Sequence, residues 1–209
     1  MLEVDGISKS YSGIRVLSPV SFCLPAGHCI GITGENGSGK STLLRLLAQV
    51  EAPDSGDIRY GGKSILANRP FLRRNLGYVP QGTDLMEDLT VRKHLQLWQS
   101  AYGLQGPIPE EITELLDLQP MMNKKIRTLS GGMKRRVSIA TALIHAPSIL
   151  IMDEATAGLD REYTGRLLSW LETYLANNGS IIWCSHHKEE LNRLCGACIR
   201  IHQGRQLAP

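Results

Sequence analysis

The chain has 209 residues, of which 42% are hydrophobic and 21% are charged, an ordinary composition for a folded soluble domain that argues against disorder. Its formal net charge of +3 is too small to indicate nucleic-acid binding by itself. No stretch approaches the roughly 18 apolar residues of a membrane span, and the acidic start does not resemble a secretory signal. We expect the five scattered cysteines to remain thiols in a reducing compartment.

The elements predicted in chain order describe a parallel α/β core. The first residues and the segment 57–65 are typical of antiparallel, hairpin-forming strands. A strand, a helix, a strand, a helix and a strand are then predicted over 28–33, 41–50, 147–153, 161–179 and 180–185. Strands that alternate with helices favour a parallel sheet.

The segment between the two parts of this core has a different pattern of apolar residues. Residues 82–145 contain no convincing strand, whereas 90–104 and 109–118 have a helical period. We therefore expect one domain, in which 1–81 and 146–209 form the α/β core with its antiparallel β region and 82–145 form a helical subdomain.

A phosphate-binding motif lies between the first core strand and its helix. Residues 34–42, GENGSGKST, fit the pattern G-x-x-x-x-G-K-[ST] in this setting, which predicts a P-loop NTPase core. The glycines allow backbone N–H groups to point at phosphate oxygens, and the helix N-terminus adds partial positive charge. Lys40 is expected at the β- and γ-phosphates and Ser41 at Mg²⁺. Nucleotide-binding residues are predicted to be Asn36, Gly37, Ser38, Gly39, Lys40, Ser41 and Thr42.

Two acidic residues end the strand at 147–153. Asp153 and Glu154 follow an apolar run, and burying both costs several kcal/mol unless a partner offsets the charge. Mg²⁺ would do so, which predicts Asp153 as a metal ligand, directly or through water. Glu154 can then polarise the attacking water as a general base. A salt bridge at the strand end is the alternative.

A third motif raises a separate question. Ser130 can cap the helix that follows it, but two consecutive glycines weaken folding because they enlarge the entropy of the unfolded chain. Their presence at Gly131 and Gly132 suggests that another group comes close to the backbone there. A capped loop without a ligand is the alternative.

These motifs together resemble the ATP-binding subunit of an ABC transporter over nearly the whole chain. LSGGM (129–133) resembles the ABC signature, with Met133 where Gln is usual, and LSGGMKRR is a form associated with exporter-type members. Ala155 replaces the usual proline after Glu154 without removing a chemical group. We expect little effect of Met133 on hydrolysis, because backbone groups bind the phosphate.

Four further motifs support the resemblance. GYVPQ, AGLD, CSHH and SKSYSG resemble the Q-loop, the D-loop, the switch-histidine region and the segment with the adenine-stacking aromatic. The resemblance implies that Gln81 lies near Mg²⁺ and the attacking water, and that Asp160 lies at a dimer interface. His186, rather than His187, is expected to bind the γ-phosphate, and Tyr11 is expected to stack on adenine.

The resemblance also offers an answer for the glycine pair. In this family two subunits pack head to tail around ATP, so Ser130, Gly131 and Gly132 would approach a γ-phosphate held by the other subunit. Only glycine permits that approach of the backbone, and the helix N-terminus favours an anion. The basic residues 134–136 are interpreted as a solvated face whose charge is tolerated beside a triphosphate.

The leading functional hypothesis is an ATPase subunit on the cytoplasmic side of the cell membrane, held there by transmembrane permease subunits. It would act as a homodimer or a heterodimer with a second ABC ATPase, with export favoured. A soluble ABC ATPase that acts on ribosomes or DNA is the alternative, but the chain has one P-loop and one signature, and no nucleic-acid partner is expected. A module that binds ATP without turnover is disfavoured by Glu154 and His186. No appended regulatory domain is expected after the last predicted strand.

Overall fold

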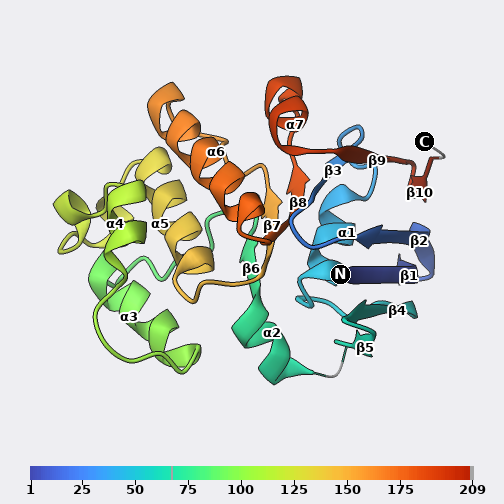
Figure 1. Cartoon of the computed structure of the whole chain (residues 1–209), viewed down its shortest axis with the longest axis horizontal. Coiled ribbons are helices and arrows are strands. Elements are labelled where there is room, and N and C mark those ends of the chain that lie inside the picture. The colour runs from blue at the N-terminus through green and yellow to red at the C-terminus, as the bar shows by residue number, and fades with distance from the viewer. Residues whose placement is uncertain (67, 208–209) are drawn as a thin grey trace.

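The computed structural model describes residues 1–66 and 68–207, so residues 67, 208 and 209 of the expected core lie outside the described part of the chain. Two sheets organise the molecule (Figure 1). The first has the strand order β2-β1-β4-β5 and is antiparallel. Its strands are β1 (Leu2–Tyr11), β2 (Ile14–Leu24), β4 (Ser55–Tyr60) and β5 (Lys63–Ser64). The antiparallel hairpin predicted at 57–65 is confirmed.

The second sheet has the order β10-β9-β3-β8-β7-β6 and is parallel except at β10. The three predicted core strands are confirmed as β3 (Cys29–Thr33), β7 (Ile149–Asp153) and β8 (Ser180–Cys184). The sequence pattern does not predict the other three, β6 (Leu76–Val79), β9 (Ala197–His202) and β10 (Arg205–Gln206). These strands are short or partly exposed, so each lacks a continuous apolar run and is defined by its neighbours in the sheet.

Two hydrophobic clusters lie on opposite faces of the parallel sheet. Ile149 and Ile151 belong to the cluster that includes α1 (Lys40–Leu47) and the antiparallel sheet. Leu150, Met152 and Trp183 belong to the other cluster, which includes α5 (Gly131–Leu143) and α6 (Arg161–Ala176). Successive residues of a strand point to opposite faces, so the unbroken apolar runs of β7 and β8 supply both clusters.

The helices of the middle segment gather at the end of the molecule opposite the antiparallel sheet (Figure 1). The helices predicted at 90–104 and 109–118 are confirmed in shorter form as α3 (Val91–Ala101) and α4 (Glu110–Leu115). The Thr90 hydroxyl caps α3 by accepting a hydrogen bond from Lys93 N at 3.3 Å. Two 3₁₀ turns, Gln119–Met121 and Ile126–Thr128, connect α4 to α5.

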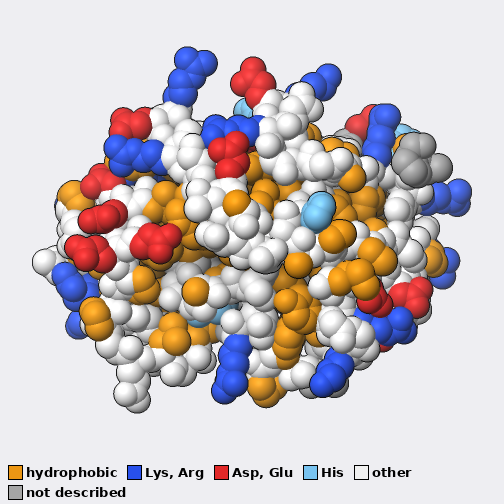
Figure 2. Space-filling model, in the orientation of Figure 1, with side chains coloured by type: hydrophobic (Ala, Val, Ile, Leu, Met, Phe, Trp, Pro, Cys, Tyr) orange, Lys and Arg blue, Asp and Glu red, His pale blue; other side chains and the backbone are white. Residues whose placement is uncertain are grey.

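Two further helices complete the described chain, α2 (Arg69–Asn75) before β6 and α7 (Lys188–Leu194) after β8. No helix within the described residues is both long and apolar enough to cross a membrane. On the face shown in Figure 2, Lys and Arg side chains are interspersed with Asp and Glu. Because β3, β7 and β8 are parallel neighbours, the segments that follow their carboxyl ends meet at one edge of the sheet.

Candidate functional site

The loop between β3 and α1 encloses the first part of the site. Gly39, the residue before α1, has φ +106°, a left-handed conformation that favours glycine. Lys40 is only 8% exposed, and its ammonium donates hydrogen bonds to the carbonyl oxygens of Gly34 at 2.8 Å and Glu35 at 2.9 Å. The loop therefore holds a buried cation at the N-terminus of a helix.

This loop, the edge of the parallel sheet and two other segments surround a cavity of about 340 Å³, the P-loop pocket. Of the residues predicted from sequence, its lining includes Asn36, Gly37, Gly39, Lys40, Ser41, Thr42, Gln81, Asp153, Glu154 and His186. His187 is not in this lining and precedes α7 as its N-terminal cap residue. The fold thus brings together side chains that are up to 150 positions apart, counting from Asn36 to His186 (186 − 36).

The two carboxylates at the end of β7 lie inside the pocket and are almost fully buried, with Asp153 2% and Glu154 8% exposed. Glu154 has φ +52°, which is uncommon for a residue with a side chain and marks a sharp turn at the strand end. His186 Nε2 lies 3.4 Å from Glu154 Oε1. Burial raises the pKa of Glu154, and the nearby His186 partly opposes that rise.

The chemistry of the pocket fits a phosphate ester with a hard cation. Within the described residues, Glu154 Oε1 is buried in the pocket without a hydrogen-bond partner, so it retains capacity for a ligand. Ser38, which the sequence predicts to bind nucleotide, is not in the lining, and its Oγ is also buried without a partner. No cluster of three or more His, Cys, Asp and Glu among the described residues can hold a metal alone. Mg²⁺ usually takes one or two carboxylates and completes its shell with water and substrate phosphates, and Asp153 with the Ser41 hydroxyl meets that requirement.

Arg135 is a buried residue of the site that sequence reasoning misinterpreted. It was expected on a solvated basic face, yet it is 3% exposed. Its guanidinium donates to four carbonyl oxygens, those of Pro80 at 2.6 Å, Gln81 at 2.9 Å, Glu154 at 2.9 Å and Ala157 at 3.4 Å. Burial lowers the pKa of Arg135, while the charges of Asp153 and Glu154 raise it.

These bonds tie α5 to the segment that contains Gln81 and to the turn after β7. A planar guanidinium with five donors can hold several carbonyls at once, whereas an isolated ammonium presents only a point charge. The signal in the sequence was weak, because a basic residue near the start of a helix is normally solvated.

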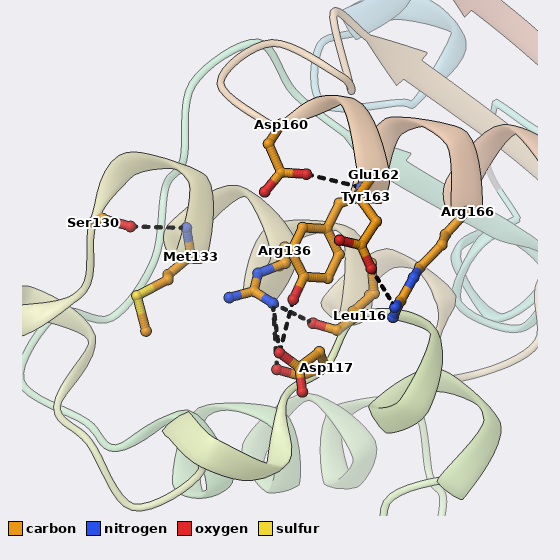
Figure 3. A network of polar contacts seen from close by, with 9 residues as sticks. All are labelled: Leu116, Asp117, Ser130, Met133, Arg136, Asp160, Glu162, Tyr163 and Arg166. Atoms are coloured by element: carbon orange, nitrogen blue, oxygen red, sulfur yellow. Dashed lines mark hydrogen bonds and ion pairs between the residues drawn. The ribbon is translucent and has the colours of Figure 1, made fainter.

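The signature residues lie outside the P-loop pocket, beside a smaller cavity of about 220 Å³. Figure 3 shows five side chains of its lining, Ser130, Met133, Arg136, Asp160 and Tyr163. We name its lining, together with Gly131, the signature surface: Ser130, Gly131, Gly132, Met133, Arg136, Gly158, Leu159, Asp160 and Tyr163. The Ser130 hydroxyl caps α5 by accepting from Met133 N at 3.4 Å, as predicted for this residue. The Asp160 carboxylate caps α6 by accepting from Tyr163 N at 2.9 Å.

The two glycines differ in their surroundings. Both lie in the first turn of α5, directly after its cap residue Ser130. A Cβ on Gly131 would meet nothing within 4 Å, whereas a Cβ on Gly132 would lie 2.6 Å from the carbonyl oxygen of Gly158. The chain itself therefore requires glycine at 132, and only an external group can require it at 131.

Arg136 also corrects the expectation of a solvated face, since it is 8% exposed. Its guanidinium lies 4.2 Å from the ring centroid of Tyr163 and donates to the Asp117 carboxylate at 3.2 Å (Figure 3). The Tyr163 hydroxyl donates to the same carboxylate at 2.8 Å. Both contacts lower the pKa of Asp117, with Tyr163 contributing most. The network joins the end of α4 to α5 and α6 beneath the signature surface.

Tyr11 is not among the residues that line the P-loop pocket. It is 37% exposed at the end of β1, and its hydroxyl donates to the Glu51 carboxylate. Arg45 connects the two places, because its guanidinium donates to the Tyr11 hydroxyl and to the Thr42 hydroxyl, both at 3.4 Å. Stacking of Tyr11 on a base stays a prediction.

Comparison with known proteins agrees with this arrangement. The family described as ABC transporter matches residues 17–157. The chain is 36% identical to the Nod factor export ATP-binding protein I of Paraburkholderia xenovorans, over 99% of this chain and 69% of that protein. It is 35% identical to the linearmycin resistance ATP-binding protein LnrL of Bacillus subtilis, over 100% of this chain and 68% of that protein.

Solved structures show the same fold. An ATP-binding subunit of an ABC transporter superposes with a TM-score of 0.92 at 29% identity, over 100% of this chain and 88% of that one. A dimeric ATP-binding cassette bound to ADP and Pi superposes with a TM-score of 0.89 at 22% identity, over 100% of this chain and 97% of that one, a likeness of fold alone. The chain belongs to the ABC transporter family as an ATP-binding subunit, an ATPase with ATP as its substrate and Mg²⁺ as its cofactor.

Proposed function

We propose that the chain drives a transporter by hydrolysing ATP within a head-to-tail dimer, in which each ATP lies between one P-loop pocket and the signature surface of the other subunit. One observation carries this proposal. The residues suited to phosphate and to water activation form one cavity, whereas Ser130, Gly132 and Asp160 line another. A single chain therefore presents two half-sites and needs a second subunit to combine them.

The P-loop pocket supplies binding and base catalysis in this proposal. Lys40 leaves its two loop carbonyls to contact the β- and γ-phosphates, and Asp153, Ser41 and Gln81 hold Mg²⁺. When bound, Mg²⁺ offsets the charge of the phosphate oxygens. Glu154 orients a water molecule and accepts its proton, a role that its raised pKa favours.

His186 completes the pocket from the segment after β8. Its imidazole lies at the mouth, with the side chain 52% exposed, and 3.4 Å from the proposed base. From this position it can donate a hydrogen bond to the γ-phosphate and respond to its loss. His187 faces a different cavity and has no such role here.

The signature surface supplies the opposite side of the partner's ATP. Ser130 and the N–H groups of Gly131 and Gly132 lie at the start of α5, which has 13 residues. Such a helix N-terminus attracts anionic groups, and the open space above Gly131 admits one. Asp160, at the start of α6, is proposed to contact the other subunit.

We further propose that membrane-spanning permease subunits hold the dimer at the cytoplasmic side of the membrane and that transport is outward. The names of the relatives support this direction, since two of them describe an export ATP-binding protein and a resistance ATP-binding protein. The dimer is made of two copies or of one copy and a second ABC ATPase. Residues 1–81 and 146–209 act as the catalytic core, and 82–145 act as a helical subdomain.

Glu154→Gln is the variant that tests this function. It should retain ATP affinity but lose hydrolysis by roughly 10²–10⁴-fold, because Gln cannot accept the proton. It should also elute as a dimer with ATP and as a monomer with ADP in gel filtration. The double variant Lys40→Ala/Glu154→Gln is the control and should remain monomeric with either nucleotide.

The same trapped variant identifies the partners. Tagged Glu154→Gln, purified from detergent-solubilised membranes with ATP, should bring down a multi-span membrane protein in near-equal amount. Ribosomal or DNA-bound proteins in its place would move the function to the soluble class. Wild-type hydrolysis by Glu154→Gln would show that another group is the base.

A further inference from the structure

A buried carboxylate on α7 has no assigned role. Glu190 is 6% exposed, although its neighbours Lys188 and Glu189 on the same short helix are exposed. None of the ion pairs among the described residues includes Glu190. Burying a carboxylate without a cation costs free energy unless its oxygen atoms accept hydrogen bonds.

Both oxygen atoms of Glu190 accept from hydroxyl groups. Oε1 accepts from the Thr156 hydroxyl at 2.8 Å, and Oε2 accepts from the Ser185 hydroxyl at 2.6 Å. All three residues are buried, with Thr156 5% and Ser185 4% exposed. Hydrogen bonds to a charged acceptor in a buried site are short and strong, so they fix the two hydroxyls relative to each other.

The two hydroxyls belong to the two segments that meet in the P-loop pocket. Thr156 lies two residues after Glu154, and Ser185 directly precedes His186. The Ser185 hydroxyl also accepts from His187 N at 3.0 Å, which holds the backbone on the far side of His186. The carboxylate of Glu190 thus joins the turn that presents the proposed base to the turn that presents the proposed switch histidine.

The turn at Glu154 needs external support. Its left-handed φ of +52° is unfavourable for a residue with a side chain, so the surrounding contacts must hold it. Arg135 holds the Glu154 carbonyl from one side. The bond from Thr156 to Glu190 holds the same turn two residues later, and the segment 158–160 of the signature surface follows shortly after it.

We propose that Glu190 is a positioning residue for hydrolysis, which sets the geometry between Glu154 and His186 by binding the Thr156 and Ser185 hydroxyls together. This inference rests on the proposed function of those two residues. Glu190 does not line the P-loop pocket but, with Thr156 and His186, lines a neighbouring cavity. Its loss should therefore disturb turnover and leave ATP binding by the P-loop intact.

The test compares Glu190→Ala with Glu189→Ala in the full chain. Glu190→Ala should lower kcat for ATP hydrolysis by about tenfold or more, because small misplacement of catalytic groups has large effects on rate, while KM changes by less than about threefold. Glu189→Ala, an exposed change one residue away, should keep kcat within about twofold. Glu190→Gln should recover part of the rate, since its amide can bond both hydroxyls after they reorient.

Thermal unfolding of Glu190→Ala distinguishes a positioning role of Glu190 from a role in folding. Should Glu190→Ala not fold, Thr156→Val and Ser185→Ala each remove one of the two bonds and are measured instead. Either variant should have a lower kcat and an unchanged KM. The kcat of the double variant Thr156→Val/Glu190→Gln should be no lower than that of the more impaired single variant. Such non-additivity is expected of residues that act through one contact.

Two results would overturn the proposal: a kcat of Glu190→Ala equal to that of Glu189→Ala, or equal loss in kcat and in ATP affinity. A failure of the underlying function gives a different result. In that case Glu154→Gln and His186→Ala would hydrolyse ATP at the wild-type rate, whereas failure of the Glu190 link alone leaves those two variants impaired.

Discussion

The P-loop pocket and the signature surface belong to one chain but are completed in different ways. In the P-loop pocket, Lys40 is buried and already bonded to carbonyl groups of its own loop. On the signature surface, Ser130 and Gly131 are exposed, and a Cβ on Gly131 would meet no atom. Internal contacts thus position the residues of the pocket, whereas the exposed residues of the signature surface need contacts from another molecule.

The two regions are nevertheless connected through the interior. Arg135 extends from the helix of the signature surface to the carbonyls of Gln81 and Glu154 in the P-loop pocket. The contact of Gly132 with Gly158 lies within the signature surface itself and joins α5 to the segment that follows Glu154. The two regions are therefore in direct contact through the side chain of Arg135.

The largest effect should come from the pocket itself. Lys40→Ala removes charge-assisted hydrogen bonds to phosphate worth about 3 kcal/mol together, so ATP affinity should fall by about 100-fold or more. Titration with a fluorescent nucleotide measures this, with Lys93→Ala on the exposed face of α3 as the control. Unchanged affinity would refute the assignment of the pocket.

Alanine substitutions at the two signature glycines should distinguish a glycine required by packing within the chain from one required by an approaching partner. Gly131→Ala should leave the melting temperature and the ATP affinity of the monomer unchanged but lower hydrolysis by about tenfold or more, since its Cβ blocks only an approaching partner. Gly132→Ala should also destabilise the single chain by about 1–3 kcal/mol, because its Cβ clashes with the Gly158 carbonyl. Full hydrolysis by Gly131→Ala would argue against the head-to-tail dimer.

The connection through Arg135 predicts a loss of stability together with a smaller effect on hydrolysis than those of the signature glycines. Arg135→Ala removes a donor from four carbonyl oxygens, of which that of Glu154 still accepts from Ala157 N, and should cost about 2–4 kcal/mol of unfolding free energy, with a fall in kcat. Lys134→Ala, one residue earlier, removes only a partly exposed ion pair with Glu87 and should cost less than about 1 kcal/mol. If chemical denaturation gave the two variants equal losses of unfolding free energy, the buried hydrogen bonds of Arg135 would contribute no more to stability than the ion pair of Lys134.

The smallest effect concerns pH. The pKa of Glu154 is raised in the folded state, so its contribution to stability is complete below its ordinary value of 4.5 and is lost as pH rises through the raised value. Without nucleotide or metal, Glu154→Gln should therefore melt at a higher temperature than wild type at pH 8. The difference should shrink as the pH is lowered toward 4.5. A difference independent of pH would show that Glu154 is not strained by burial.

The sequence by itself determined the phosphate loop, the acidic strand end, three core strands and the helices at 90–104, 109–118 and 161–179. These features are local: a glycine-rich motif, an apolar run or a helical period lies within a few neighbouring residues. The order of the motifs also indicated the family.

Only the tertiary structure decided the features that depend on distant neighbours. Whether Arg135 is solvated or buried depends on carbonyls 19 to 55 positions away, and the need for glycine at 132 depends on Gly158. Likewise, Glu190 looks like any charge on a helix until Thr156, 34 positions earlier, is folded against it. Hydrogen-bond satisfaction and steric fit are properties of packed pairs, so no period or motif within one segment can express them.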